Sequence, residues 1–233
     1  MTAETPNTLE GIPLFRSLSP EARDTLLRRS RWRRFAAQEQ IIERDDPGRD
    51  VFFVAEGSAR VVNYSLSGRE VSFDDMGAGS FFGQLSALDD QPRSANVVAV
   101  VDTLVLAVPQ QVFLQVATEN PKIALAVMRN LAAVLRQATE RIMDLSTLGA
   151  NNRVHAEILR LARPNLKPDG TAVITPIPLH GDIASRVSTT RETVARVFGD
   201  LARSGLVERR EHQLKINDFQ TLVDMVEEVR GEI

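Results

Sequence analysis

Turn signals recur regularly in the N-terminal half of the chain and limit what it can fold into. They are Asp46-Pro47-Gly48, Glu56-Gly57, Ser67-Gly68 and Gly77-Ala78-Gly79. Short apolar runs lie between them at 51–54, 59–64 and 70–73, and the stretch 95–108 is mostly valine, leucine and alanine. Turns spaced by roughly 8–12 residues leave room for short strands joined by tight connections. The pattern therefore predicts a small antiparallel β-roll.

A long helical pattern follows the predicted roll. Asn120-Pro121 supplies a helix start, and Leu148-Gly149-Ala150 is expected to break the helix and to act as a hinge, because glycine lets the backbone bend. Apolar residues recur at alternating spacings of three and four, at Met128, Leu131, Leu135, Ala138, Ile142 and Leu145. This spacing is typical of the seam of a parallel helix pair. A helix packed on its own roll would produce a similar pattern over so short a span, so both interpretations stay open.

Two short helical segments follow Gly149, at 182–187 and 190–197, and flank Ser188-Thr189. Their small apolar residues allow two helices to cross closely. Arg191, Glu192 and Arg196 fall on the face left over once those residues are buried. A helix that enters the major groove would present them to base edges, where arginine suits guanine and glutamate suits cytosine. Glu192 also lies three residues after Thr189, the spacing of a capping box, so it has a structural alternative.

Residues 207–216 predict a two-stranded wing with Arg209, Arg210 and Lys215 near its tip, suited to phosphate contacts. The net charge of the whole chain is −3. A DNA-binding prediction therefore depends on these individual residues and not on bulk charge.

A second group of polar residues lies at the end of the predicted roll. Phe82-Gly83-Gln84-Leu85-Ser86 is followed, after a short polar gap, by Pro92-Arg93-Ser94-Ala95. Glycine lets backbone N–H groups approach an anion, and a short helix start beside it adds a partial positive charge. Arg93 supplies a fork of donors for phosphate oxygens, while Ser94 adds a hydroxyl and Gln84 can accept from a sugar hydroxyl. These residues predict a site for one small phosphate with its sugar.

Together, this loop and the string Arg191-Glu192-Thr193-Val194 resemble the cyclic-AMP receptor protein/FNR family of bacterial transcription regulators. The resemblance runs from about residue 14 to about residue 219 and implies an α+β fold. The implied sensor domain, 1–148, has two parts. They are an N-terminal antiparallel β-roll, which is the cyclic-nucleotide-binding jelly roll, and a long dimerisation helix at about 120–148. A winged helix-turn-helix DNA-binding domain occupies 149–233.

The resemblance also implies the function and its residues. It indicates a ligand-responsive regulator, not an enzyme, in which a cyclic nucleotide gates two recognition helices of a homodimer. The ligand contacts it implies are Phe82, Gly83, Gln84, Leu85, Ser86, Arg93, Ser94, Ala95 and, from the long helix, Thr139. The DNA contacts it implies are Ser188, Thr189, Thr190, Arg191, Glu192, Arg196, Arg209 and Arg210. The implied partners are palindromic double-stranded DNA with half-sites of TGTGA type, a second copy of the chain and RNA polymerase.

Two positions depart from the family pattern. Ser188 stands where the family usually has glycine, so a hydroxyl residue is expected in a left-handed conformation. Gln84 stands where most nucleotide-responsive relatives have glutamate, and a neutral acceptor weakens a hydrogen bond to ribose by roughly tenfold in affinity. Cyclic AMP is the favoured effector and cyclic GMP an alternative. A regulator with a vestigial or differently liganded pocket stays open.

The amino-acid composition excludes several other classes of protein and of functional site. The chain has no cysteine, which excludes disulfides, thiolate metal sites and a cysteine nucleophile. Its three histidines are His155, His180 and His212, all beyond the predicted roll, so a metal-dependent enzyme built on the roll is not expected. Neither a membrane-spanning apolar run nor a signal pattern at residues 2–6 is present, and the expected location is the cytoplasm.

Overall fold

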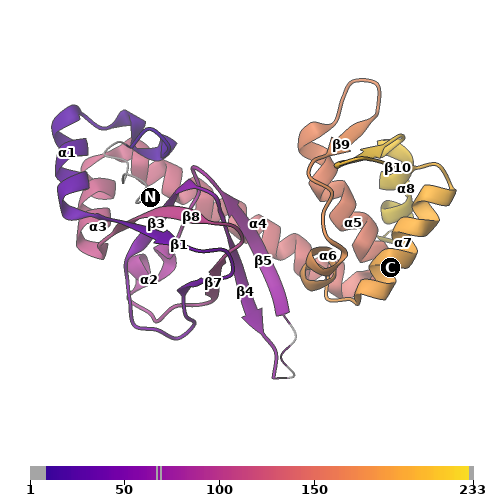
Figure 1. The fold of residues 1–233 in the computed structure, drawn as a ribbon, viewed down its shortest axis with the longest axis horizontal. Coiled ribbons are helices and arrows are strands. Elements are labelled where there is room, and N and C mark those ends of the chain that lie inside the picture. The colour runs from indigo at the N-terminus through magenta and orange to yellow at the C-terminus, as the bar shows by residue number, and fades with distance from the viewer. Residues whose placement is uncertain (1–8, 67, 69, 231–233) are drawn as a thin grey trace. The chain divides into compact units, whose positions relative to one another are not determined.

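The computed structural model describes residues 9–66, 68 and 70–230 (Figure 1). Of the predicted turns, the one at Ser67-Gly68 has its Ser67 outside these residues. The chain divides into two compact units, one up to Ala133 and one from Val134.

The N-terminal unit begins with a short 3-10 helix, η1 (Pro13–Ser17), and with α1 (Pro20–Arg29). Ser19 caps α1 by accepting a hydrogen bond from the backbone N–H of Ala22 at 3.2 Å, and Pro20 takes the first helical position. Both residues have the roles that N-cap and first-turn chemistry favours.

Antiparallel strands form the body of this unit. They are β1 (Arg31–Phe35), β2 (Gln40–Ile42), β3 (Val51–Glu56), β4 (Ser58–Tyr64), β5 (Glu70–Gly77), β6 (Phe81–Phe82), β7 (Asn96–Ala99) and β8 (Thr103–Val108). They pair in two four-stranded sheets, of order β1-β8-β3-β6 and β2-β7-β4-β5. The predicted antiparallel roll is confirmed, and the apolar stretch 95–108 supplies one strand to each sheet.

The residues of β3 show how the two sheets and the helices share a core. Phe52 and Val54 belong to the cluster between the sheets, whereas Val51 and Phe53 belong to a cluster with the helices. Successive strand residues point to opposite faces, so a strand buried on both faces is apolar throughout. The centroids of the Phe53 and Phe15 rings lie 4.6 Å apart. The helices that contribute to this cluster include η1, α1, α3 (Gln110–Glu119) and the first part of α4 (Pro121–Thr147).

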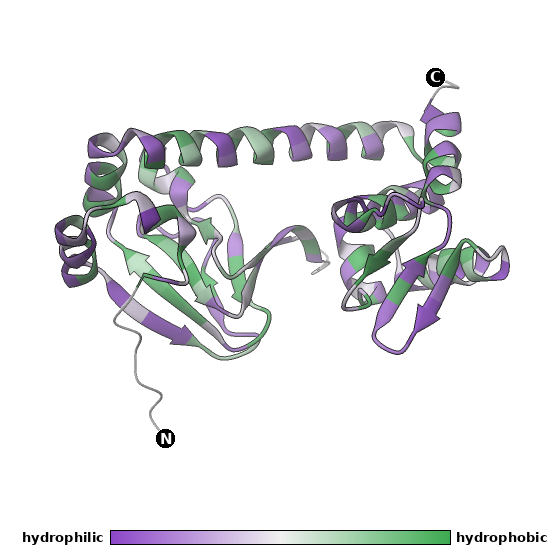
Figure 2. Ribbon diagram, turned by 90° about the horizontal axis from the view of Figure 1, so that it is seen from above, coloured by the Kyte–Doolittle hydropathy of each residue, from purple (hydrophilic) through white to green (hydrophobic). Residues whose placement is uncertain are grey.

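The long helix predicted at about 120–148 is α4, and hydrophobic and hydrophilic residues alternate along it (Figure 2). Ile123 and Val127 are buried in the N-terminal unit. Met128 and Leu135, from the predicted seam, are 57% and 68% exposed, and Ile142 is 63% exposed. An apolar stripe of this extent on one helix is typical of an unpaired interaction surface. In the described part of the chain, no helix is long and apolar enough to cross a membrane.

The C-terminal unit contains the rest of α4 and a small mixed domain. Its elements are α5 (Ala150–Ala162), η2 (Arg163–Asn165), β9 (Ala172–Ile174), α6 (His180–Arg186), α7 (Arg191–Arg203), β10 (Val207–Arg210), β11 (Gln213–Ile216) and α8 (Phe219–Arg230). The strands pair in the order β10-β11-β9, and β10 and β11 are the predicted wing. One apolar core joins α5, α6, α7 and α8 and includes Leu148, the residue after α4.

The predicted helix break at Gly149 is present, because α4 ends at Thr147 and α5 begins at Ala150. Gly149 has φ −63° and ψ 161°, an extended conformation open to any residue. A Cβ added at Gly149 would meet no atom within 4 Å. The backbone geometry of this break therefore does not require glycine.

Candidate functional site

The predicted phosphate-binding loop folds around Gly83, which joins β6 to α2 (Gln84–Asp89). Gly83 has φ 82°, in the left-handed region that disfavours side chains. A Cβ there would lie 2.7 Å from Nη1 of Arg93 and 2.9 Å from the carbonyl oxygen of Asp50. Both the backbone conformation and this close approach require glycine.

Arg93 is 5% exposed, although it is a charged residue. Its Nη1 donates to the carbonyl of Gly83 at 2.9 Å, and its Nη2 donates to the carbonyl of Asp50 at 2.8 Å. The guanidinium carbon lies 5.7 Å from the centroid of the Phe52 ring. Burial lowers the pKa of Arg93, and the charges of Asp50 and Asp46 oppose that shift. Arginine nevertheless stays protonated, so a desolvated positive charge is held against the glycine turn.

A polar cavity of about 500 Å³ lies beside this arginine. It is lined by Arg33, Gln40, Ile41, Ile42, Glu43, Asp46, Gly48, Arg49, Asp50, Phe52 and Arg93. Loop 43–50 also exchanges backbone hydrogen bonds with Arg93, through Asp45 at 2.9 Å and Asp46 at 3.0 Å. No residue pattern marks this loop as functional, since Asp46-Pro47-Gly48 has the ordinary pattern of a turn.

The other predicted ligand residues are distributed around the same loop. Phe82, Gln84 and Ser86 are buried, Ala95 is half-buried, and Leu85 and Ser94 are exposed. Nε2 of Gln84 donates to Oδ1 of Asn130 on α4 at 3.3 Å. Thr139 is exposed on α4, and its hydroxyl donates to the carbonyl of Leu135 one turn earlier at 3.0 Å. The structure thus brings Gly83, Gln84 and Arg93 together, while a ligand role for Thr139 stays a prediction.

The predicted helix-turn-helix consists of α6, the turn at 187–190, and α7. Ser188 has φ 52°, so a serine does take the left-handed conformation expected at this position. The capping-box prediction for Thr189 and Glu192 is wrong by one residue. Thr190 has the extended conformation of an N-cap, and its hydroxyl oxygen accepts from the N–H of Thr193 at 3.3 Å. Thr190 is therefore the N-cap, and α7 begins at Arg191.

A residue that the sequence analysis missed holds this turn in place. Arg153 of α5 donates from Nε to the carbonyl of Val187 at 2.8 Å and from Nη2 to that of Ser188 at 3.2 Å. Its Nη1 donates to the carbonyl of Leu148, after α4, at 2.8 Å. No sequence signal marks such a residue, because its partners are backbone carbonyls that every residue type provides.

The predicted reading residues occupy the outer face of α7. Arg191, Glu192 and Arg196 are exposed. On the opposite face of α7, Val194, Val197 and Leu201 are buried. The pKa of Glu192 lies below its ordinary value because its own backbone N–H and the Thr190 side chain hydrogen-bond its carboxylate. Nη2 of Arg196 donates to Oδ1 of Asn151 at 3.2 Å.

Within α6, a Cβ added at Gly181 would lie 2.9 Å from Nε of Arg191. In the wing, Arg209 and Arg210 are exposed on β10, and Arg210 pairs with Glu208 at 2.8 Å. The predicted DNA contacts of the helix and of the wing are thus all surface residues except Thr189, which is 9% exposed, and the half-buried Ser188.

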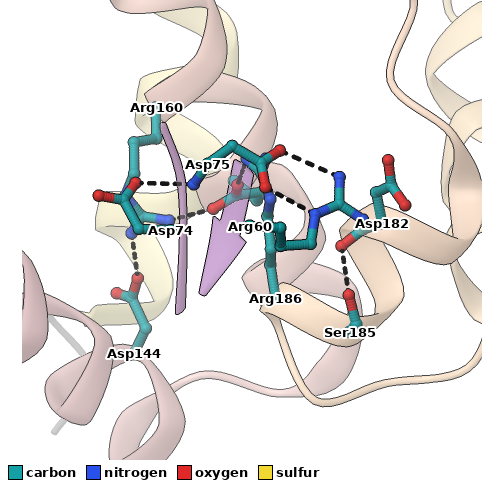
Figure 3. Close-up of polar contacts among 9 residues, drawn as sticks. Arg60, Asp74, Asp75, Asp144, Arg160, Asp182, Ser185 and Arg186 are labelled. Atoms are coloured by element: carbon teal, nitrogen blue, oxygen red, sulfur yellow. Dashed lines mark hydrogen bonds and ion pairs between the residues drawn. The ribbon is translucent and has the colours of Figure 1, made fainter. Parts of the chain in front are cut away.

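A chain of ion pairs links the end of α4 to α6 inside the C-terminal unit. Asp144 of α4 pairs with Arg160 of α5 at 3.0 Å, as Figure 3 shows, and also with Arg230 of α8. Arg160 also pairs with Glu157, and Glu157 pairs with Arg186 of α6 at 3.0 Å. The Asp144 and Glu157 side chains are 8% and 1% exposed. These carboxylates are buried, and each has arginine partners, as buried charges require.

A separate ion pair braces the β4–β5 hairpin of the N-terminal unit, where Arg60 and Asp75 make a two-pronged contact at 2.6 and 3.0 Å (Figure 3). The same figure shows Ser185 donating to the Asp182 carbonyl within α6.

Three features define a DNA-binding regulator with a sensor domain. They are a β-roll with a buried arginine at a glycine turn, a long helix with an exposed apolar stripe, and a winged helix-turn-helix. Family models agree with this description. The model described as "Cyclic nucleotide-binding domain" matches residues 32–120. The model described as "Crp-like helix-turn-helix domain" matches residues 152–225.

Known proteins are similar over most of their length. The cyclic AMP receptor protein of Thermus thermophilus is 35% identical over 85% of this chain and 89% of its own. The cAMP-activated global transcriptional regulator Vfr of Pseudomonas aeruginosa is 31% identical over 79% of this chain and 88% of its own. A solved structure of a CooA variant from Carboxydothermus hydrogenoformans has a TM-score of 0.77 at 23% identity and covers 87% of this chain and 90% of its own.

The chain therefore belongs to the cyclic-AMP receptor protein/FNR family of transcription regulators. It carries a cyclic-nucleotide-binding domain and a DNA-binding helix-turn-helix, and regulators of this family bind DNA as dimers.

Proposed function

We propose that a cyclic mononucleotide, with cyclic AMP favoured over cyclic GMP, binds in the β-roll and gates two recognition helices of a homodimer. In this proposal residues 1–148 form the sensor domain with its dimerisation helix, and residues 149–233 form the DNA-binding domain. The observation that carries the proposal is the hydrogen bond from Arg93 to the carbonyl of Gly83. It joins a buried cation to a turn that only glycine can make.

The donor inventory of Arg93 supports an anionic ligand. Guanidinium has five N–H groups, and the bonds to Gly83 and Asp50 use one on each terminal nitrogen. The remaining N–H groups are available for phosphate oxygens. Because the cation is desolvated, a hydrogen bond to an anion there is stronger than one at the surface. The two carbonyl contacts also fix the guanidinium plane, so little side-chain entropy is lost on binding.

The exposed stripe on α4 supports the dimer. Met128, Leu135 and Ile142 follow the heptad spacing of the predicted seam, and all three are more than half exposed. Pairing with the same helix of a second copy would remove this apolar surface from water. The ligand shifts the arrangement of the dimer only to the extent that it binds one arrangement more tightly than the other.

For the DNA-binding domain we propose that Arg191, Glu192 and Arg196 read base edges in a palindromic site with half-sites of TGTGA type. Their exposure on one face of α7 supports this role. Arg209 and Arg210 of the wing would contact phosphates, which orient the domain without specifying sequence. RNA polymerase is the further partner in this proposal.

Calorimetry tests the ligand. Full-length protein is titrated with cyclic AMP, cyclic GMP and, as a control, linear AMP, and one cyclic mononucleotide should bind. Arg93→Lys keeps the charge but cannot present a fork, so it should weaken binding by about tenfold or more. The matched variant Arg44→Lys, at an exposed arginine that does not line the cavity, should bind like the parent. Absence of binding by both cyclic nucleotides, or equal losses in the two variants, would overturn the ligand assignment.

Fluorescence anisotropy at fixed salt tests the DNA site. The probes are a duplex with two TGTGA half-sites and a duplex with scrambled half-sites, each with and without the cyclic nucleotide. Arg191→Ala should cost about 1–3 kcal/mol on the specific duplex and much less on the scrambled one. Arg209→Ala should weaken both duplexes alike. A uniform loss with Arg191→Ala would make that residue a phosphate contact.

A further inference from the structure

Two groups of contacts in the C-terminal unit fasten the end of α4 to the helix-turn-helix. In the first, Arg153 bonds the carbonyl of Leu148 on one side and the carbonyls of Val187 and Ser188 on the other. In the second, ion pairs run from Asp144 through Arg160 and Glu157 to Arg186 of α6. Leu148 itself is 4% exposed in the core of this unit.

These contacts bear on what Gly149 can do. A rotation of the backbone at Gly149 would separate Leu148 from α5, and it would break the bond from Arg153 and the pair between Asp144 and Arg160. Gly149 also has an ordinary extended conformation with open space around it. The backbone at Gly149 therefore does not act as a freely rotating hinge between α4 and α5 while these contacts are present.

We infer that Arg153 is a positioning residue that transmits the position of the end of α4 to the turn before the recognition helix. Two of the three bonds of Arg153 hold the backbone at Val187 and Ser188, the third holds Leu148, and Ser188 is the left-handed residue of the turn that precedes α7. Any displacement of Leu148 is thereby passed to the start of α7 through one rigid, planar group. The last turn of α4, from Asp144, moves with the DNA-binding domain. This inference rests on the proposed nucleotide-gated function for its regulatory meaning.

The first test does not depend on any ligand. Hydrogen exchange is measured on the full chain, the Arg153→Met variant and the Gly149→Ser variant. Serine is a favoured N-cap for α5 and meets no neighbour, so Gly149→Ser removes glycine freedom without breaking a contact. Arg153→Met should speed exchange by about tenfold or more both at the end of α4, 144–148, and at the turn 187–190. Gly149→Ser should leave both segments unchanged.

The second test measures regulation. The readout is the ratio of DNA affinities with and without cyclic AMP for the duplex with two TGTGA half-sites. Arg153→Met should reduce this ratio at least severalfold toward one, whereas Gly149→Ser should keep it. A purely structural role for Arg153 would instead lower both affinities and leave their ratio intact. Arg153→Lys, which can reach one carbonyl but not three, should give an intermediate ratio.

The outcomes separate the two proposals. If the parent protein shows no response to cyclic nucleotide, the proposed function fails, and the exchange experiment still decides whether Arg153 joins the two segments. If the parent responds, the inference fails when Arg153→Met keeps the full ratio, when exchange rises in only one of the two segments, or when Gly149→Ser abolishes the response.

Discussion

Arg93 should stabilise the N-terminal unit even in the absence of any ligand. The perturbation is Arg93→Ala, which removes the donors to the carbonyls of Gly83 and Asp50 at 2.9 and 2.8 Å. A hydrogen bond from a charged group contributes about 1.5–3 kcal/mol, so two such bonds give about 3–6 kcal/mol. The stacking on Phe52 adds about 0.5–1 kcal/mol.

A desolvation cost offsets part of this sum. Burial lowers the pKa of Arg93, so the buried guanidinium carries a desolvation penalty that alanine removes. Asp50 is exposed and Gly83 is half-buried, so water replaces part of what their carbonyls lose when Arg93 is removed, and the loss of the two bonds is the larger effect. We therefore expect Arg93→Ala to destabilise this unit by about 3 kcal/mol, near the lower end of the range for two charged hydrogen bonds.

The single tryptophan makes the assay specific. Trp32 lies in β1, within the N-terminal unit, so its fluorescence reports the unfolding of that unit. In urea, a loss of about 3 kcal/mol at a slope near 2 kcal/mol per molar lowers the midpoint by about 1.5 M. Arg49→Ala is the matched control, because Arg49 and its partner Asp90 have side chains 44% and 65% exposed. Such a pair contributes at most about 1 kcal/mol. A midpoint for Arg93→Ala no lower than that for Arg49→Ala would refute the reasoning.

Three further predictions concern the C-terminal unit. Glu157→Gln removes the buried carboxylate that pairs with Arg186 and one of the two that pair with Arg160, and it should destabilise this unit by about 3 kcal/mol by circular dichroism, with the Trp32 transition unchanged. Burial lowers the pKa of His155 below 6.5, so the unfolded chain binds the proton more tightly. The unit should keep its full stability above pH 6.5 and lose stability as the pH falls toward the folded-state pKa, and His155→Gln should flatten that dependence in urea titrations. Ser188→Gly relieves a φ of 52° and should stabilise the unit by about 0.5–1 kcal/mol in thermal unfolding, whereas a loss of stability would contradict the strain.

Local chemistry allowed much of the fold to be predicted. Asn120-Pro121 opens the long helix, and the helix ends at Thr147, just before the predicted break at Gly149. These features follow from the conformations of one or two residues, so they can be recognised without knowledge of distant parts of the chain. Of the heptad residues, Met128, Leu135 and Ile142 are exposed on α4, whereas Leu131 packs against the N-terminal core.

The candidate site was predictable in its residue types but not in its geometry. Gly83 was identified because few residues other than glycine adopt a left-handed turn. Arg93 was identified because only arginine presents a planar fork of donors. The partner of Arg93 at Asp50 lies 43 residues away and contributes only its backbone carbonyl. The capping-box error at Thr189 has a related cause, since spacing alone does not show which of two adjacent threonines takes the extended conformation of the N-cap.

The amino-acid sequence was enough to predict the strands and turns of the roll and the long helix. It was also enough to predict the loop that contains Gly83 and the loop that contains Arg93. These are decided by side-chain periodicity and by backbone preferences that act over a few residues. The tertiary structure alone decided which carbonyls Arg93 and Arg153 bond, and which arginines neutralise Asp144 and Glu157. The physical reason is that a backbone carbonyl is the same in every residue, and a carboxylate accepts any arginine that the fold brings within reach.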